Sequence, residues 1–174
     1  TRSHALQFLG LERDRAQSYP AFNDYLIKLR VPGDNAVPIN SRGQISRNEW
    51  IAWAEGVWTW HDISQTDTLN AAEGRGENDT KHICPLQLGV IERCVRLWSN
   101  PGEIVFSPFA GIGSEGYQSL LLGRRFYGCE IKQEYYDVAI RNCQRAIQMR
   151  EQRERPPLFA ELTASRCHRE GCAP

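Results

Sequence analysis

A short strand followed by a glycine-containing loop constrains the fold of this chain more than any other feature. Residues 103–114 read EIVFSPFAGIGS, and residues 125–130 read RFYGCE after an intervening helical pattern. The order is therefore strand, glycine loop, helix, strand and acid. A nucleotide-type cofactor needs this layout, because glycines let the backbone approach it closely and the carboxylate holds ribose hydroxyls. The feature predicts a class of cofactor and leaves the reaction open.

The residue before the glycines narrows that class. Phe109 is an aromatic residue that directly precedes Ala110, Gly111 and Gly113. A pyrophosphate site requires freely accessible amides at a helix N-terminus. The loop is therefore expected to suit a cofactor without phosphates.

Residues 81–150 have the pattern of a parallel α/β sheet. A helix is expected to begin at Pro85, followed by a buried strand at 104–106 and a helix at 115–122 that stops at Gly123. A second strand is expected at 125–131 and a long helix at 133–150. The residues expected on buried helix faces are Leu88, Ile91, Val95 and Trp98 in the first helix, and Tyr136, Ala139, Ile140, Cys143 and Ile147 in the last.

The first 80 residues are more varied. A helix is expected at 5–18 and a strand at 24–31, which is rich in apolar and β-forming residues and closes at Pro32 and Gly33. Ser46 and Glu49 form a capping box that starts another helix. Its expected buried residues are Trp50, Trp53, Ala54, Val57 and Trp58. Stacking of one tryptophan on a nucleobase is the alternative to core packing.

Composition excludes some classes of protein. Lys plus Arg and Asp plus Glu are both 21, so a basic DNA-binding surface would have to be local. The sequence contains neither a run long enough to span a membrane nor a visible signal peptide. The six cysteines are scattered, which is typical of reduced thiols and favours the cytoplasm. Cys167, His168 and Cys172 could bind zinc only with a further partner, so we expect a solvated tail and no metal site.

Three elements together resemble the amino-group DNA methyltransferases that use S-adenosylmethionine. Residues 107–116 (SPFAGIGSEG) are similar to the signature D-P-F-x-G-x-G-T. Residues 81–93 (KHICPLQLGVIER) resemble H-P-x-x-K-P…L-I-E-R, which precedes the glycine loop in that family. Residues 123–131 (GRRFYGCEI) resemble G-R-x-F-x-G-x-E. The three elements have the family's order and spacing and cover about residues 80–145.

The resemblance implies a fold and a division of the chain. The fold is a Rossmann-like class I methyltransferase fold of the α/β class, here a partial one with a parallel-sheet core, plus a recognition region. Residues 1–80 would form the end of the catalytic and target-recognition region, residues 81–150 the S-adenosylmethionine-binding subdomain, and residues 151–174 a C-terminal tail. This is the β-type motif order. The residues of the motifs are similar to those of methyltransferases carried by bacteriophages.

The resemblance also assigns the cofactor-binding residues. Phe109, Ala110, Gly111 and Gly113 would lie against the methionine and ribose, and Ser114 is also expected to bind the cofactor. Glu130 would bind both ribose hydroxyls, and Ile131 would cover the adenine face. His82 would close over the methionine end, although a structural or exposed histidine is an equal alternative.

Two departures from the family pattern stand out. Ser107 replaces the Asp before Pro-Phe, which removes a charge and keeps a hydroxyl. The catalytic tetrad Asp/Asn/Ser-Pro-Pro-aromatic is missing, because the only Pro-Pro pair, at 156–157, follows Arg155 and precedes Leu158. The catalytic residues are therefore unknown. In a β-type order we expect them upstream of Thr1.

The expected reaction is methyl transfer from S-adenosylmethionine to the exocyclic amino group of adenine in DNA, with cytosine as the less favoured alternative target. The expected partners are double-stranded DNA and the cofactor, with a homodimer left open. Local basic residues would contact phosphates, among them Lys28, Arg30, Arg42 and Arg47. The main alternative is a non-catalytic module that binds cofactor or DNA. Methylation of RNA or protein is a weaker one.

Overall fold

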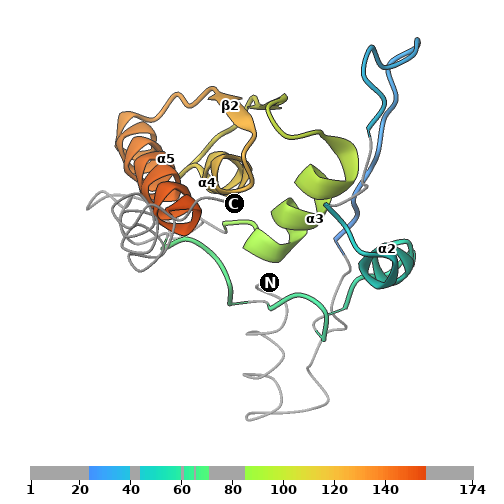
Figure 1. Ribbon diagram of the computed structural model, residues 1–174. Helices are drawn as coiled ribbons and strands as arrows, with labels where there is room; N and C mark the ends of the chain where they lie inside the picture. The colour runs from blue at the N-terminus through green and yellow to red at the C-terminus, as the bar shows by residue number, and fades with distance from the viewer. Residues whose placement is uncertain (1–23, 40–43, 60, 65, 71–84, 156–174) are drawn as a thin grey trace, which may run out of the picture. The chain divides into compact units, whose positions relative to one another are not determined.

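The computed structural model describes residues 24–39, 44–59, 61–64, 66–70 and 85–155 (Figure 1). The chain divides into two compact units between Ile39 and Asn40. The predicted boundary at residue 80 and the predicted helix at 5–18 lie outside the described residues.

The described part of the first unit, residues 24–39, has an extended and bent backbone, and every residue in it is exposed. The strand predicted at 24–31 is therefore wrong. Tyr25, Leu29 and Val31 are 85%, 87% and 83% exposed. Their strand preference depends on packing against neighbouring strands and a core, and these side chains have no such cover here.

The centre of the second unit is a parallel pair of strands, as predicted. Strand β1 (Ile104–Ser107) pairs with β2 (Arg125–Gly128), with Ile104 opposite Arg125 and Ser107 opposite Gly128. The second strand ends at Gly128, earlier than the predicted residue 131. Full burial of the first strand was wrong, because Ile104 and Phe106 are more than half exposed.

Helix α4 (Ser114–Leu121) connects the two strands and packs against both. It also lies between α3 (Leu88–Trp98) and α5 (Gln133–Glu154), as Figure 1 shows. Gly123, at φ +77°, follows the helix as the predicted C-terminal cap. The central core cluster consists of Leu69, Ile112, Tyr117, Val138 and Ala146.

The stripe predicted for α3 is confirmed at Ile91 and Val95, which are buried. The helix begins at Leu88 and not at Pro85, since Gln87 is its N-cap. Residues 61–64 and 66–70 lie alongside it: the Leu88 N–H donates to the Asp67 carbonyl over 2.9 Å, and the Arg93 side chain donates to the Asp62 carbonyl over 3.1 Å.

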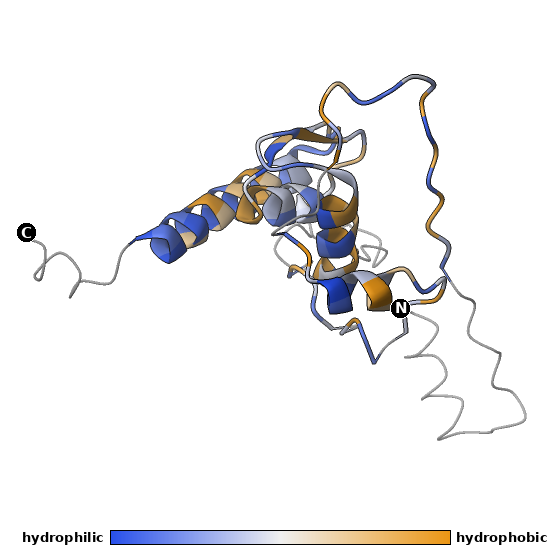
Figure 2. Cartoon of the chain, turned by 45° about the vertical axis from the view of Figure 1, so that its right-hand side comes forward, coloured by the Kyte–Doolittle hydropathy of each residue, from blue (hydrophilic) through white to orange (hydrophobic). Residues whose placement is uncertain are grey.

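The buried face of α5 differs from the prediction. Ala139 is buried as predicted, but Tyr136 and Ile140 are 46% and 41% exposed. The other buried residues of the helix are Val138, Asn142 and Ala146. Asn142 can occupy a core position because its side-chain amide donates to the Ile112 carbonyl over 2.8 Å. The helix also continues four residues beyond the predicted end. Its last turns are hydrophilic (Figure 2), and the chain leaves the helix at Arg155, just before a proline.

Helix α2 (Arg47–Trp53) has the predicted capping box. Ser46 Oγ accepts from the Glu49 N–H over 3.2 Å, and the Glu49 carboxylate accepts from the Ser46 N–H over 2.7 Å. The predicted apolar face is wrong: the helix ends at Trp53, none of its residues is buried, and Val57 is 68% exposed.

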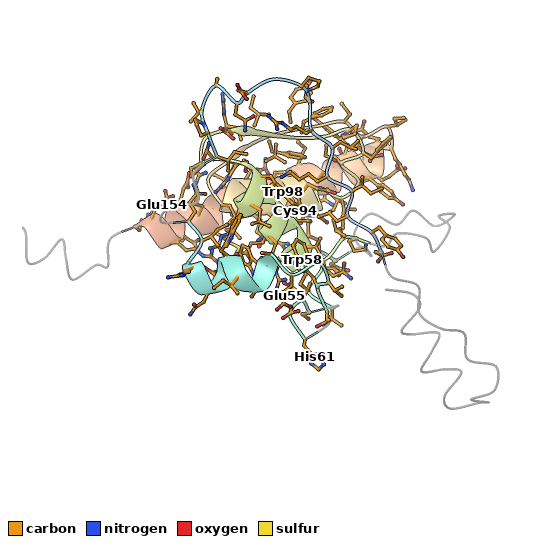
Figure 3. The ribbon with its side chains drawn as sticks, turned by 90° about the vertical axis from the view of Figure 1, so that its right-hand side faces the viewer. Glu55, Trp58, His61, Cys94, Trp98 and Glu154 are labelled. Atoms are coloured by element: carbon orange, nitrogen blue, oxygen red, sulfur yellow. The ribbon has the colours of Figure 1, made fainter. Side chains whose placement is uncertain are left out.

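Arginines on α3 hold the tryptophans of this region. The Arg93 guanidinium lies 5.4 Å from the Trp53 ring centre and 5.1 Å from that of Trp58. Figure 3 labels Trp58 beside α3, which also carries Cys94 and Trp98. Arg96 stacks on Trp53 and pairs with Glu49 over 3.3 Å. Cation–π contacts thus replace the predicted burial of a tryptophan face, and base stacking by these tryptophans stays a prediction.

A buried arginine fastens the end of α3 to the sheet. Arg124, 4% exposed, donates to Ser99 Oγ over 3.1 Å, to the Ser99 carbonyl over 2.7 Å and to the Leu122 carbonyl over 2.8 Å. Its Nη2 also donates to Gln44 Oε1 over 2.5 Å.

Among the described residues, no helix is both long and apolar enough to cross a membrane.

Candidate cofactor site

The candidate site lies at the carboxyl ends of the two parallel strands. The glycine loop, residues 108–113, follows β1, and Glu130 comes two residues after β2. Ligands of open α/β sheets bind at this edge. The fold therefore brings the loop and the acid together across 19 residues of sequence, as the order of elements predicts.

A hydrogen bond joins the acid directly to the loop. Glu130 Oε2 accepts from the Gly111 N–H over 2.8 Å. Its Oε1 accepts from the N–H groups of Ile131 and Lys132 over 3.0 and 2.9 Å. Nearby, the Ala110 N–H donates to the Cys129 carbonyl over 2.8 Å. The carboxylate is thus oriented by three backbone donors before any ligand binds.

Glycine is needed at positions 111 and 113 for different structural reasons. Both have positive φ, +54° at Gly111 and +82° at Gly113, which favours glycine. A Cβ on Gly111 would meet nothing within 4 Å, so space at this position is open. A Cβ on Gly113 would lie 2.9 Å from the Ala139 Cα, so this glycine allows α4 to approach α5.

The other predicted site residues occupy contrasting environments. Ala110 and Ser114 are buried, at 6% and 4% exposed. Phe109 and Ile131 are 85% and 101% exposed, so two large apolar side chains stand free at this end of the strands. His82 lies outside the described residues.

Two supporting residues escaped the sequence reasoning. Asn142 binds the carbonyl of Ile112 in the middle of the loop. Gly116 gives the Phe126 ring room, since a Cβ there would lie 2.7 Å from it. The signal for Gly116 was available: Gly111, Gly113 and Gly116 have the spacing G-x-G-x-x-G, in which the third glycine permits close helix–strand packing. Glycine spacing alone therefore does not exclude a dinucleotide.

Two polar side chains beside the loop, Glu115 and Ser107, are shielded from solvent. Burial raises the pKa of Glu115, in the first turn of α4. Ser107, which stands where the resembling family has Asp, is buried at 8% exposed, and its carbonyl accepts from the Cys129 N–H over 3.0 Å. The site thus offers an acceptor for hydroxyl groups in Glu130 and apolar contact surface in Phe109 and Ile131. In the part of the chain that the structure describes, no group of side chains is arranged to hold a metal ion.

Two parallel strands joined by a helix, with a glycine loop and an acid bonded to that loop at their carboxyl ends, give the described part of the chain a mixed α/β architecture. The chain belongs to the DNA methylase family of the N6/N4 type, which matches residues 15–141. The family match confirms the resemblance seen in the motifs and implies the Rossmann-like methyltransferase fold.

Known relatives agree with that assignment. The chain is 29% identical over 124 residues to type II methyltransferase M.BglII of Bacillus subtilis, covering 69% of this chain and 32% of that protein. It is 40% identical over 80 residues to type II methyltransferase M1.MboII of Moraxella bovis, covering 46% of this chain and 30% of that protein. A third relative is DNA adenine methyltransferase YhdJ of Escherichia coli K12, 40% identical over 52 residues, which are 30% of this chain and 18% of YhdJ.

The chain spans about a third or less of the length of these relatives. The three come from bacteria and include type II methyltransferases, as in restriction-modification systems. They give no support to the phage-like origin that the residues of the motifs suggested.

Proposed function

We propose that this chain forms the S-adenosylmethionine-binding part of a DNA methyltransferase that methylates the exocyclic amino group of adenine. The observation that carries the proposal is the bond between the Gly111 N–H and Glu130. It aligns Glu130, the acid that would bind the ribose, with an open glycine loop in a chain of the N6/N4 methylase family.

The residues at the site fit the cofactor. Glu130 Oε2 accepts one backbone bond and, as a carboxylate oxygen with about two lone pairs, can accept a ribose hydroxyl as well. The open space at Gly111 admits close approach of the ligand. Phe109 and Ile131 supply apolar surface for the adenine and the methionine chain.

When bound, S-adenosylmethionine supplies a methyl group on a sulfonium. The role of this chain is to hold the donor so that methyl, sulfur and the target nitrogen can align. The target base has to leave the duplex, because its amino group is occupied in pairing. Two supports favour adenine over cytosine: family frequency, and the adenine specificity named for YhdJ.

Calorimetric titration of S-adenosylmethionine into the 174-residue chain tests the proposal. Gly111→Asp should weaken binding by at least tenfold. Gly102→Asp is the matched control, since Gly102 also has positive φ and open space but lies in the turn before β1. Equal binding by wild-type chain and Gly111→Asp would contradict the loop assignment.

The ribose acid is tested in the same way. Glu130→Ala should weaken binding more than Glu134→Ala, which removes an exposed acid from the first turn of α5. The reverse order would mean that the acid is misplaced. An S-adenosylmethionine concentration series with the wild-type chain supplies the reference.

DNA contacts and assembly belong to the proposal as well. Lys28, Arg30 and Arg47 are exposed, and Arg30 pairs with Asp34 over 3.6 Å. Arg42 lies outside the described residues. If these residues bind phosphates, the affinity of the chain for duplex DNA should fall steeply with salt. Sedimentation velocity decides whether the chain is a homodimer.

A non-catalytic module is the second candidate, and one observation favours it. The only Pro-Pro pair of the sequence follows Arg155 and so departs from the tetrad. Reading the gene on the 5′ side of the Thr1 codon separates the two. An in-frame Asp/Asn/Ser-Pro-Pro-aromatic segment supports the enzyme, and its absence contradicts it.

A further inference from the structure

Glu115 is a carboxylate that is shielded from solvent without a cation to balance it. It stands in the first turn of α4, two residues after Gly113, and is only partly accessible. Burial raises its pKa, so the protein holds the charged form at a cost in free energy. The carboxylate accepts from its own backbone N–H. Among the residues that the structure describes, no Lys, Arg or His side chain forms an ion pair with it.

The carboxylate of Glu115 lies at the glycine loop. A helical side chain leans toward the turn that precedes it, and for Glu115 this turn is the loop, with Ile112 and Gly111 three and four residues back. The bond to its own N–H keeps the carboxylate at this end of α4. The loop therefore has two acids: Glu130, which accepts from the Gly111 N–H over 2.8 Å, and Glu115, at the start of the helix that follows.

The strand before the loop lacks an acid on the side that α4 covers. Phe126 lies on that side, because its ring fills the space beside Gly116 of α4. Val105 pairs with Phe126, so Val105 and, two residues on, Ser107 face α4 as well. Ser107 stands where the resembling family has Asp. The negative charge that β1 does not supply is thus present on α4, in Glu115.

We propose that Glu115 binds the ammonium group at the methionine end of S-adenosylmethionine. This inference rests on the proposed function and deepens it. Glu130 is assigned there to the ribose, and its oxygens already accept three backbone bonds. Of the two cationic groups of the cofactor, only the ammonium donates hydrogen bonds. A carboxylate only accepts them, so Glu115 matches the ammonium in charge and in hydrogen bonding. The cation then offsets the cost of the shielded charge.

Asp67 is the rival acid for this role. It belongs to residues 66–70, of which Leu69 packs in the same core cluster as Ile112 of the loop. Asp67 is exposed, however. A solvated carboxylate has to give up water when it binds a cation, whereas Glu115 is already shielded in the free protein. The structure therefore favours Glu115.

Calorimetry on the 174-residue chain with three ligands tests the assignment. S-adenosylmethionine carries both cations, S-adenosylhomocysteine keeps the ammonium without the sulfonium, and methylthioadenosine lacks the whole amino-acid end. Glu115→Gln should weaken binding of the first two by roughly tenfold or more, as loss of a charge-assisted bond predicts, and leave methylthioadenosine binding unchanged. Glu134→Gln, which removes an exposed acid from the first turn of α5, is the matched control and should change none of the three.

Four results would overturn the inference: unchanged binding of S-adenosylmethionine by Glu115→Gln, an equal loss for methylthioadenosine, a loss confined to S-adenosylmethionine, which would mean pairing with the sulfonium, or a larger loss in Asp67→Asn. Thermal unfolding followed by circular dichroism verifies that each variant is folded, and Glu115→Ala serves if Glu115→Gln unfolds. The wild-type chain keeps the two proposals separate. Failure of this chain to bind S-adenosylmethionine refutes the proposed function, and with it this inference, whereas equal binding by wild-type chain and Glu115→Gln refutes only the role of Glu115.

Discussion

Replacing the second loop glycine by alanine should destabilise the protein far more than replacing the first. Gly113 and Gly111 stand two residues apart in one loop, and both have positive φ. An alanine at either position bears the cost of a left-handed backbone, roughly 1–2 kcal/mol. The two positions differ in what a new methyl group would meet.

The Cβ of an alanine at 113 would lie 2.9 Å from both the Cα and the Cβ of Ala139. The Cα belongs to the backbone of α5 and cannot rotate away, so the helix has to move. Overpacking of this kind costs roughly a further 1–3 kcal/mol. At Gly111 the methyl would meet nothing within 4 Å. We therefore expect Gly113→Ala to cost about 2–5 kcal/mol and Gly111→Ala about 1–2 kcal/mol.

Urea unfolding of the two variants, followed by circular dichroism, measures both costs. The denaturation midpoint should fall much further for Gly113→Ala, with an unchanged slope if the unfolded state is unaffected. Equal midpoints for the two variants would refute the argument that Gly113 is needed for the approach of α4 to α5. It would then be a glycine for its backbone angle alone.

Three further predictions concern charged side chains. Glu130→Gln should lower the free energy of unfolding by about 1 kcal/mol even without cofactor, because an amide cannot accept three backbone N–H bonds as the carboxylate does; Glu134→Gln is the control, and equal melting of the two would contradict this. Arg124→Lys should cost about 2 kcal/mol in urea unfolding, since a lysine cannot reach all of the buried acceptors, whereas Arg125→Lys, at an exposed position, should cost less. Burial raises the pKa of Glu115 above its usual value of 4.5, so the folded state binds the proton more tightly and stability falls as the pH rises through this raised pKa. Glu115→Gln should therefore stabilise the protein at neutral pH and change little below pH 4; no gain at neutral pH would refute it.

The order of elements in the second unit could be predicted from the sequence because its signals are local. Apolar periodicity located α3, α4 and α5, and Gly123 marked the end of α4. Burial was less predictable. Ile104 and Phe106 have the composition of a core strand but are exposed, because burial depends on what covers the sheet and not on the strand itself.

The core side of α5 was misjudged for a related reason. Periodicity favoured Tyr136 and Ile140, which are apolar, over Asn142, which is polar. The asparagine is buried because an unpaired carbonyl of the loop, that of Ile112, requires a donor there. The need for a donor at this carbonyl depends on the conformation of the folded loop, so the hydrophobicity of the sequence does not predict it.

The candidate site shows the same division. The identity of the acid and of the glycines follows from motif spacing, and the bond between Glu130 and Gly111 agrees with that reading. The different tasks of the glycines do not follow from spacing. Gly111 leaves open space beside the loop, whereas the absence of a Cβ at Gly113 and at Gly116 of α4 makes room for Ala139 and Phe126. Only the packing of α4 against its neighbours separates these roles.

These contacts hold the loop on the side that faces α5 and β2, and they leave open space at Gly111. The N–H groups of Ala110 and Gly111 donate to the Cys129 carbonyl and the Glu130 carboxylate. The Ile112 carbonyl accepts from the Asn142 side-chain amide. The backbone of the loop is therefore ordered without a ligand, so cofactor binding has little backbone entropy to overcome there. The ordering cost of binding falls instead on the exposed side chains of Phe109 and Ile131.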